Sequence, residues 1–304
     1  MKLCTWSVAI ALLAGPVVAV AGDLEDSVQS MRDAVTKKDV PEVKKLAAAI
    51  HELACEAIEE PAPAAPEEKQ NWQERVAYAK SVQTYAEGAL VSTALQQPPA
   101  VLIDMMSSLE ARNPKSKYLD EAYGAYLLAL NKTGATAKIP ALAEKALVNF
   151  PENEDLLLLL TDNAVSRKQS DRALILANRL VASLTRHPRP EGMAAADWDR
   201  KRNAGLTHGY YAAGLISAEK GQWIAADKNL RSALPLVRGT PSMAGPALFY
   251  LGMANYELGK MTLSKARVLE AAKFSEQAQS LDSPFQEQAR HNALVMKNEA
   301  AKMR

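Results

Sequence analysis

Apolar residues recur three and four positions apart along most of the chain, which is the spacing of one face of an α-helix. Val28, Met31 and Val35 form one such stripe near the start. No stretch alternates apolar and polar positions with an enrichment in β-branched residues, as a half-buried strand would. We therefore predict an all-helical chain.

Turn residues divide this helical pattern into antiparallel pairs. The first pair spans 24–59 and turns at Lys38-Asp39. Longer loops are expected at 186–203 and 239–246, which contain prolines. The remaining predicted helices span 71–96, 99–112, 118–131, 139–149, 156–165, 172–184, 206–219, 223–236, 247–258, 262–281 and 284–302.

The first 21 residues have the composition of a secretory signal peptide. A basic residue, Lys2, precedes an apolar run that ends in the small-x-small sequence Ala19-Val20-Ala21. We expect cleavage after Ala21 and export of the protein. An uncleaved membrane anchor is the alternative, although Pro16 interrupts the apolar run. No later segment is predicted to span a bilayer.

Charge and proline content divide the expected mature chain. An acidic hairpin over 22–60 is followed by a Pro/Ala-rich linker over 61–70 and a helical array over 71–304. Residues 22–70 carry twelve acidic and six basic side chains, whereas 201–304 carry eight and fourteen. Once Lys2 is removed the 36 basic side chains become 35, which balance the 35 acidic ones. This balance argues against a dedicated nucleic-acid binder, which needs concentrated positive charge.

A pattern with a period of about 34 residues runs through the middle of the chain. Tyr123 is followed by Gly134, and one period later Leu157 is followed by Lys168 at the same offset. The fullest unit has a large residue at Tyr210, small residues at Gly214, Ala226 and Ala233, and a glycine turn at Gly221. The first half of that set recurs at Leu248, Gly252 and Gly259. Such a period without strands is typical of stacked helix-turn-helix units.

These offsets resemble the tetratricopeptide repeat, closely over 118–282 and loosely over 24–112. The departures from the family pattern are Thr161 at a small-residue position and Lys168 at the glycine turn. The resemblance implies a right-handed superhelical solenoid of antiparallel hairpins. The last helix, with Phe285 and Leu294 among its apolar residues, is expected to cap the core. The chain is similar to exported bacterial proteins of this family, so a periplasmic location is expected.

In proteins of this family the first helix of each hairpin lines a concave groove. The resemblance therefore implies a partner-binding face at seven positions: Asn131, Asp162, His208, Tyr211, Phe249, Met253 and Tyr256. Exposed aromatic side chains there would anchor a peptide or a helix. The alternative is that Tyr211 and Phe249 fill the core between repeats, as most aromatic residues on packed helices do.

The sequence Asp197-Trp198-Asp199 lies in the expected loop at 186–203. Trp198 would either pin this insertion against the array or present an aromatic anchor to a partner. In the first case Asp197 or Asp199 would cap the following helix.

The sequence contains no motif that predicts catalysis, a cofactor or a metal. His51 and Cys55 lie four residues apart and share a helix face, but no third ligand for zinc is evident. Leu258-Gly259-Lys260 lacks the upstream glycine of a phosphate-binding loop. Cys55 is the one cysteine of the expected mature chain, so it has no intrachain disulfide partner.

Together these features favour a non-enzymatic interaction module that binds a protein, as a peptide or a helix, in the concave groove. The alternative is a structural subunit of an envelope complex that uses its convex face or the 186–203 insertion.

Overall fold

The computed structural model describes residues 17–190 and 192–303. These residues form thirteen α-helices, a 3-10 turn (η1, Thr136–Lys138) and no strand, which confirms the all-helical prediction. The α-helices are α1 (Val17–Lys37), α2 (Val40–Glu59), α3 (Pro66–Ala94), α4 (Pro99–Arg112), α5 (Lys117–Lys132), α6 (Ile139–Asn149), α7 (Glu154–Ser166), α8 (Ser170–Arg186), α9 (Ala195–Glu219), α10 (Trp223–Val237), α11 (Pro241–Met261), α12 (Lys265–Gln279) and α13 (Gln286–Lys302). Of the predicted signal peptide, residues 1–16 lie outside the described residues and 17–21 belong to α1.

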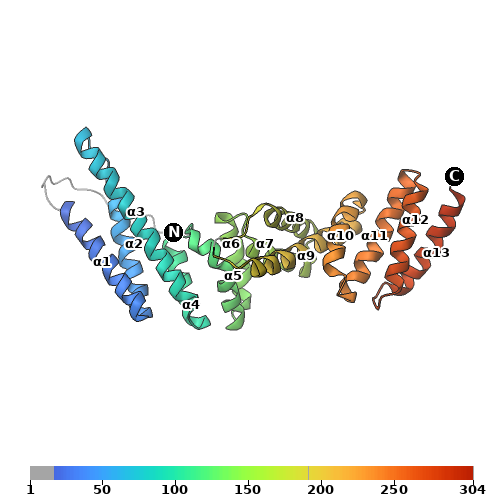
Figure 1. The fold of residues 1–304 in the computed structure, drawn as a ribbon, viewed down its shortest axis with the longest axis horizontal. Helices are drawn as coiled ribbons and strands as arrows, with labels where there is room; N and C mark the ends of the chain where they lie inside the picture. Colours follow the sequence, from blue (N-terminus) through green and yellow to red (C-terminus); the bar gives the residue numbers. More distant parts are fainter. Residues whose placement is uncertain (1–16, 191, 304) are drawn as a thin grey trace. The chain divides into compact units, whose positions relative to one another are not determined.

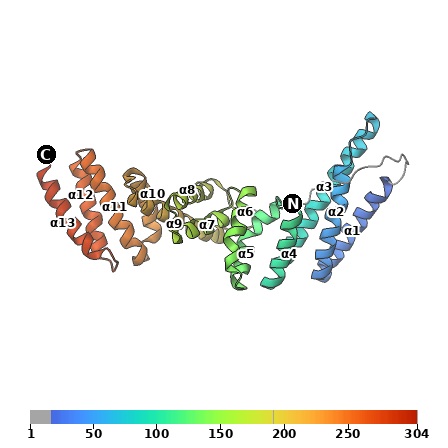
Figure 2. The same cartoon turned by 180° about the vertical axis from the view of Figure 1, so that it is seen from behind.

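The helices gather into two compact units, Met1–Thr136 and Ala137–Arg304. Within each unit every helix packs against the next one along the chain. In the second unit, α10 to α13 stand side by side in sequence order (Figures 1 and 2).

In the first unit, α1 and α2 both pack on α3, so the acidic hairpin and α3 form one body. Helix α3 begins at Pro66, within the predicted linker.

Five odd-numbered helices, α1, α5, α7, α9 and α11, end in the same turn. A single residue just after each helix takes a positive φ: Lys38 is the first residue after α1, and Gly134, Lys168, Gly221 and Leu263 are the second residues after the other four helices. The N–H of the next residue donates to the carbonyl five positions back, at 2.8 to 2.9 Å in all five turns. This is the Schellman arrangement, which satisfies carbonyls that the helix end leaves free. The turns predicted at Lys38, Lys168 and Gly221 are therefore confirmed.

The repeat pattern placed the turn of α11 at Gly259, which was wrong. Helix α11 continues to Met261, and Leu263 takes the positive φ instead. Gly259 is buried inside the helix, where an added Cβ would lie 2.7 Å from Val268 Cγ2 and 3.1 Å from its backbone nitrogen. The glycine is needed because α12 approaches α11 closely at this point.

Both predicted loops are shorter than expected. Helix α9 begins at Ala195, so the second half of the 186–203 insertion is helical. Helix α11 begins at Pro241 and includes Pro246 within its first turns. Pro241 is tolerated at the first position because the first N–H groups of a helix have no partner inside it, whereas Pro246 lies inside the helix. Proline content alone therefore overestimated the length of these connections.

Helix α13 covers α12 at the end of the second unit. Its buried stripe consists of Ala289, Ala293, Met296 and Ala300. Leu294, which was expected in this stripe, lies one position outside it and is 61% exposed. None of the helices among the described residues is both long enough and apolar enough to cross a membrane.

Candidate functional site

The odd-numbered helices of the second unit form one row. Helix α7 contacts α9, α9 contacts α11, and α11 contacts α13. Within the described residues no comparable contact joins two even-numbered helices. We call the exposed surface of α7, α9 and α11 the odd-helix face, because six of the seven predicted groove residues belong to these three helices. The seventh, Asn131, is exposed at the end of α5 in the first unit.

Two ion pairs join α7 to α9 on this face. Lys201 Nζ lies 2.8 Å from Asp155 Oδ2, and His208 Nδ1 lies 3.3 Å from Asp162 Oδ1. The partners in each helix are seven residues apart, which is about two turns. The constant offset shows that α7 and α9 run parallel and in register. The structure thus brings together Asp162 and His208, two of the predicted site residues.

The Asp162–His208 pair remains accessible to solvent. The side chains of His208 and Asp162 are 49% and 56% exposed, compared with 32% and 26% for Lys201 and Asp155. The hydrogen bond with Asp162 raises the pKa of His208, and the carboxylate charge adds to this effect, whereas partial burial opposes it. The odd-helix face therefore carries a polar pair whose charge depends on pH.

Tyr211 lies one turn beyond His208 and is half-buried. It packs against the core formed by Leu230, Ala247 and Leu251, and its ring also lies near Tyr250. Burial, and then the neighbouring Tyr250, raises the pKa of the Tyr211 hydroxyl. Tyr211 therefore joins α9 to α10 and α11 while keeping part of its surface exposed.

Phe249 belongs to the core, the second of the two alternatives that the sequence left open. It is 4% exposed and stacks on Phe285 with a centroid distance of 4.5 Å. Tyr250 approaches its ring edge-on at 5.2 Å. Because Phe285 begins the segment that leads into α13, the last helix closes over this part of α11. Phe249 is not available to a partner.

Met253 and Tyr256 are also covered from the side of α13. The amide of Asn292 donates to Met253 Sδ at 3.3 Å. Burial raises the pKa of Tyr256 to about 12, and a hydrogen bond from its hydroxyl to Glu299 adds to this rise. Both residues pack beside a core cluster that includes Met296. Within the second unit, the exposed polar part of the predicted groove is therefore confined to α7 and α9.

Trp198 is 7% exposed, so the tryptophan is a packing residue of α9 and not an exposed anchor. The predicted aspartate cap was wrong. Ala194 occupies the N-cap position, and its methyl side chain forms no hydrogen bond. Asp197 lies in the first helical turn and pairs with Arg200. A carboxylate is still favourable there because the N-terminal end of a helix carries partial positive charge.

His51 and Cys55 share a face of α2, as predicted, and Gln83 of α3 completes the contact. Cys55 Sγ lies 3.6 Å from His51 Nε2, and the Gln83 amide lies 2.8 Å from His51 Nδ1. Burial, followed by the charge of Arg112, lowers the pKa of His51, and burial raises the pKa of the Cys55 thiol. The pair is therefore a neutral imidazole and a protonated thiol at neutral pH, which is the opposite of an activated nucleophile.

A second histidine cluster joins the two ends of the α7–α8 hairpin. His187 Nδ1 lies 2.5 Å from Glu154 Oε1, and His187 Nε2 lies 3.1 Å from Glu152 Oε2. Burial alone would lower the pKa of His187, but the two carboxylates together raise it. Ser183 also lies at Nδ1, 3.3 Å away, on the same ring nitrogen as Glu154. A serine relay needs an accessible hydroxyl that donates to the imidazole, whereas Ser183 is 1% exposed and donates to the backbone carbonyl of Glu152 at 2.6 Å.

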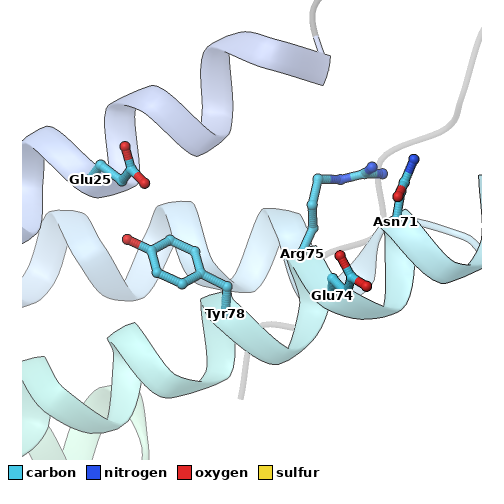
Figure 3. Close-up of a pocket in the computed structure, with 5 residues that line it drawn as sticks. All are labelled: Glu25, Asn71, Glu74, Arg75 and Tyr78. Carbon is cyan, nitrogen blue, oxygen red and sulfur yellow. The ribbon is translucent and has the colours of Figure 1, made fainter.

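One open pocket of about 350 Å³ lies in the first unit. Glu25 projects into it from α1, and Asn71, Glu74, Arg75 and Tyr78 line it from α3 (Figure 3). All five side chains are exposed or half-buried. Among the described residues, no three His, Cys, Asp or Glu side chains are placed to share a metal ion. The pocket residues belong to no motif, so sequence reasoning did not find them.

Comparison of the sequence with models of known protein families gives no match, and comparison with curated proteins gives none either.

Proposed function

We propose that this protein is a non-enzymatic interaction module of the tetratricopeptide-repeat type, exported to the periplasm, which binds a partner protein on the odd-helix face. The partner would present an extended peptide or a helix, the two forms that a groove between parallel helices accommodates. The proposal rests on the exposed Asp162–His208 pair, because its polar side chains reach solvent where α7 and α9 meet.

The repeated turn supports the assignment to this repeat type. The positive-φ residues of α5 and α7, Gly134 and Lys168, are separated by the period of about 34 residues that such repeats have. The contacts among odd-numbered helices support a curved array with these helices on the inside, because helices on the inside of a curve approach one another more closely. A right-handed superhelix is the form of this array that the resemblance implies.

The chemistry of the exposed face supports a partner with charged or polar side chains. Asp162 and His208 are each held by one contact and keep further hydrogen-bonding capacity. Tyr211 adds an aromatic surface one turn away. A polar seam beside an aromatic side chain is typical of peptide-binding surfaces, where aromatic residues contribute affinity and polar residues fix the register.

The test is photocrosslinking in intact bacterial cells. A photoreactive amino acid is placed singly at Asp162 or His208, and at the matched positions Asn178 of α8 and Lys228 of α10. All four positions are exposed. The proposal predicts a discrete covalent adduct from the first two positions and none from the even-numbered helices.

Two outcomes would contradict the proposal. Adducts only from α8 and α10 would favour a structural subunit that uses its convex face. Absence of any specific adduct at the odd-helix face, with the protein folded and exported, would remove that face as the binding site. As a second check, Asp162→Lys should abolish the adduct from His208 while far-ultraviolet circular dichroism stays unchanged.

A further inference from the structure

The turns that follow α7, α9 and α11 lie along one edge of the second unit. The three helices are neighbours in the odd-numbered row, and each is antiparallel to the helix that follows it, so their C-terminal ends point the same way. An ion pair of 2.5 Å between Lys220 and Asp171 joins the first two turns. We call residues 165–171, 219–224 and 260–265 the turn edge.

The turn edge exposes large apolar side chains to solvent. Leu263 is 82% exposed, Ile224 75% and Met261 72%. Among the described residues, Val148 is the one other large apolar side chain that is more than 70% exposed, and it lies at the opposite end of the helices, near the C-terminus of α6. Single exposed apolar residues are common on proteins, but their concentration on one edge calls for a different explanation.

Folding does not explain the choice of Leu263. It has a φ of 53°, a conformation that is unfavourable for a residue with a Cβ, and two of the equivalent turns have glycine there, Gly134 and Gly221. Its side chain gains little from burial because it is largely exposed. An exposed leucine in an unfavourable conformation therefore serves neither the stability nor the solubility of the isolated chain.

The same edge has an excess of positive charge. Arg167 and Lys168 form no ion pair with any carboxylate in the described part of the chain. Lys265 Nζ donates to the backbone carbonyl of Met303 at 2.9 Å and forms no ion pair within the described residues. Lys302 adds a further charge, because α13 is parallel to α11 and ends at the same edge.

The carboxylates of this region compensate only part of that charge. Asp171 pairs with Lys220, and Glu257 pairs with Lys260 at 3.4 Å. Glu299 is hydrogen-bonded to Tyr256. Glu219 is the remaining exposed acidic residue near these turns. The edge therefore combines protruding apolar tips with net positive charge.

We propose that the turn edge docks onto an anionic lipid bilayer, with Leu263, Met261 and Ile224 entering the headgroup region. A membrane surface attracts basic side chains electrostatically and takes up apolar ones that protrude by a few ångströms. The turns of parallel helices end at a similar level, so several can touch one flat surface together. This peripheral contact is separate from the odd-helix face and does not depend on its function.

The test is co-sedimentation of the purified mature protein with vesicles of phosphatidylcholine containing phosphatidylglycerol, compared with phosphatidylcholine alone. The double variant Met261→Ser/Leu263→Gly removes two apolar tips, and we expect it to lower the partition coefficient about tenfold. The double variant Arg167→Gln/Lys168→Gln should lower it roughly twenty-fivefold, at about fivefold for each charge removed. Higher salt should weaken binding of the wild type, because it screens surface charge.

The matched control is Val148→Ser, which removes an equally exposed apolar side chain from the opposite end and should leave binding unchanged. Far-ultraviolet circular dichroism verifies that each variant is folded. The proposal is overturned if the wild type does not sediment with anionic vesicles, if it binds neutral vesicles equally well, or if the control loses as much binding as Met261→Ser/Leu263→Gly. Apolar tips that instead join two protein copies would show as a doubled mass in light scattering without lipid, which would also overturn it.

Discussion

Helices α9 and α11 carry equivalent groove positions in the repeat pattern, but the structure treats them in opposite ways. On α9, His208 is about half exposed and Tyr211 is half-buried. On α11, Phe249 is 4% exposed, and Met253 and Tyr256 contact α13. The difference comes from the segment around Phe285 and from α13, which cover these positions of α11. Equivalent sequence positions become a surface or a core according to what packs beside them.

The largest expected effect is the difference in stability between alanine variants of Phe249 and of Tyr211. Phe249→Ala should lower the free energy of unfolding by about 3–5 kcal/mol, because it leaves a cavity beside Phe285 and Tyr250. Tyr211→Ala should cost about 1–2 kcal/mol, because the ring is only partly buried. Urea denaturation followed by circular dichroism measures both. Equal losses would show that the two aromatic residues are similarly buried and that the comparison is wrong.

A smaller effect is expected at Gly214 and Gly252, the glycines at which α9 and α11 pack closely against α10 and α12. An added Cβ on Gly214 would lie 2.6 Å from Leu230 Cγ and 3.2 Å from its backbone nitrogen. On Gly252 it would lie 2.6 Å from Ser275 Oγ and 3.3 Å from the carbonyl oxygen of Ala271. Gly214→Ala should cost about 1–3 kcal/mol, because the branched Leu230 side chain has little room to move.

Gly252→Ala should cost less than Gly214→Ala, because the Ser275 hydroxyl can rotate away from the new methyl group. That rotation sacrifices the contact of the hydroxyl with Met296 Sδ at 3.4 Å. Thermal denaturation of the two single variants ranks the costs. A larger loss for Gly252→Ala would mean that α11 and α12 are packed more rigidly than α9 and α10.

Substitutions in the turns after α9 and α11 should change the free energy of unfolding in opposite directions. Gly221→Ala places a Cβ at a φ of 68° and should lower the free energy of unfolding by about 1 kcal/mol. Leu263→Gly removes the same steric conflict between a Cβ and the backbone, at a φ of 53°. The free energy of unfolding should rise by up to about 1 kcal/mol, once the greater flexibility of glycine in the unfolded chain is subtracted. Urea midpoints measure both changes. Destabilisation by Leu263→Gly would reveal a packing role for Leu263 that its exposure does not show.

The smallest effect is a pH dependence that α9 has and α11 lacks. The pKa of His208 is raised above its ordinary value of 6.5 by Asp162. The pair should therefore stabilise the fold fully below about pH 6.5, and this contribution is lost as the pH rises through the folded-state pKa. Both side chains are about half exposed, so the contribution should stay below about 0.5 kcal/mol.

Nuclear magnetic resonance titration of the imidazole tests this prediction directly. Asp162→Asn should lower the pKa of His208 toward its ordinary value, while the titration of His187, which has carboxylate partners of its own, stays unchanged. An unaltered pKa of His208 in Asp162→Asn would show that the two side chains do not interact in solution.

Several features of the fold could be predicted from residue type and spacing. Helical periodicity predicted the helical class, and the turns at Lys38, Lys168 and Gly221 followed from local patterns. The turn of α11 could not be found in this way, because a buried glycine and a turn glycine look alike in a sequence. Gly259 serves a close contact with Val268, and this is known only when α12 is placed against α11.

The candidate site was predicted only in part. Sequence offsets selected Asp162 and His208 from different repeats, and the register of α7 and α9 brings them together. The same offsets selected Phe249, which the last helix buries. The pocket lined by Glu25 and Tyr78, and the turn edge around Leu263, have no motif, so only the placement of the helices defines them.

The sequence by itself determined that this chain folds into helices and where many of them begin and end, because backbone propensity, capping and turn residues act over a few neighbouring positions. The tertiary structure alone decided which of the equivalent faces are open. Burial depends on neighbours that lie one or two helices away along the chain, and the periodicity of a single helix carries no information about them.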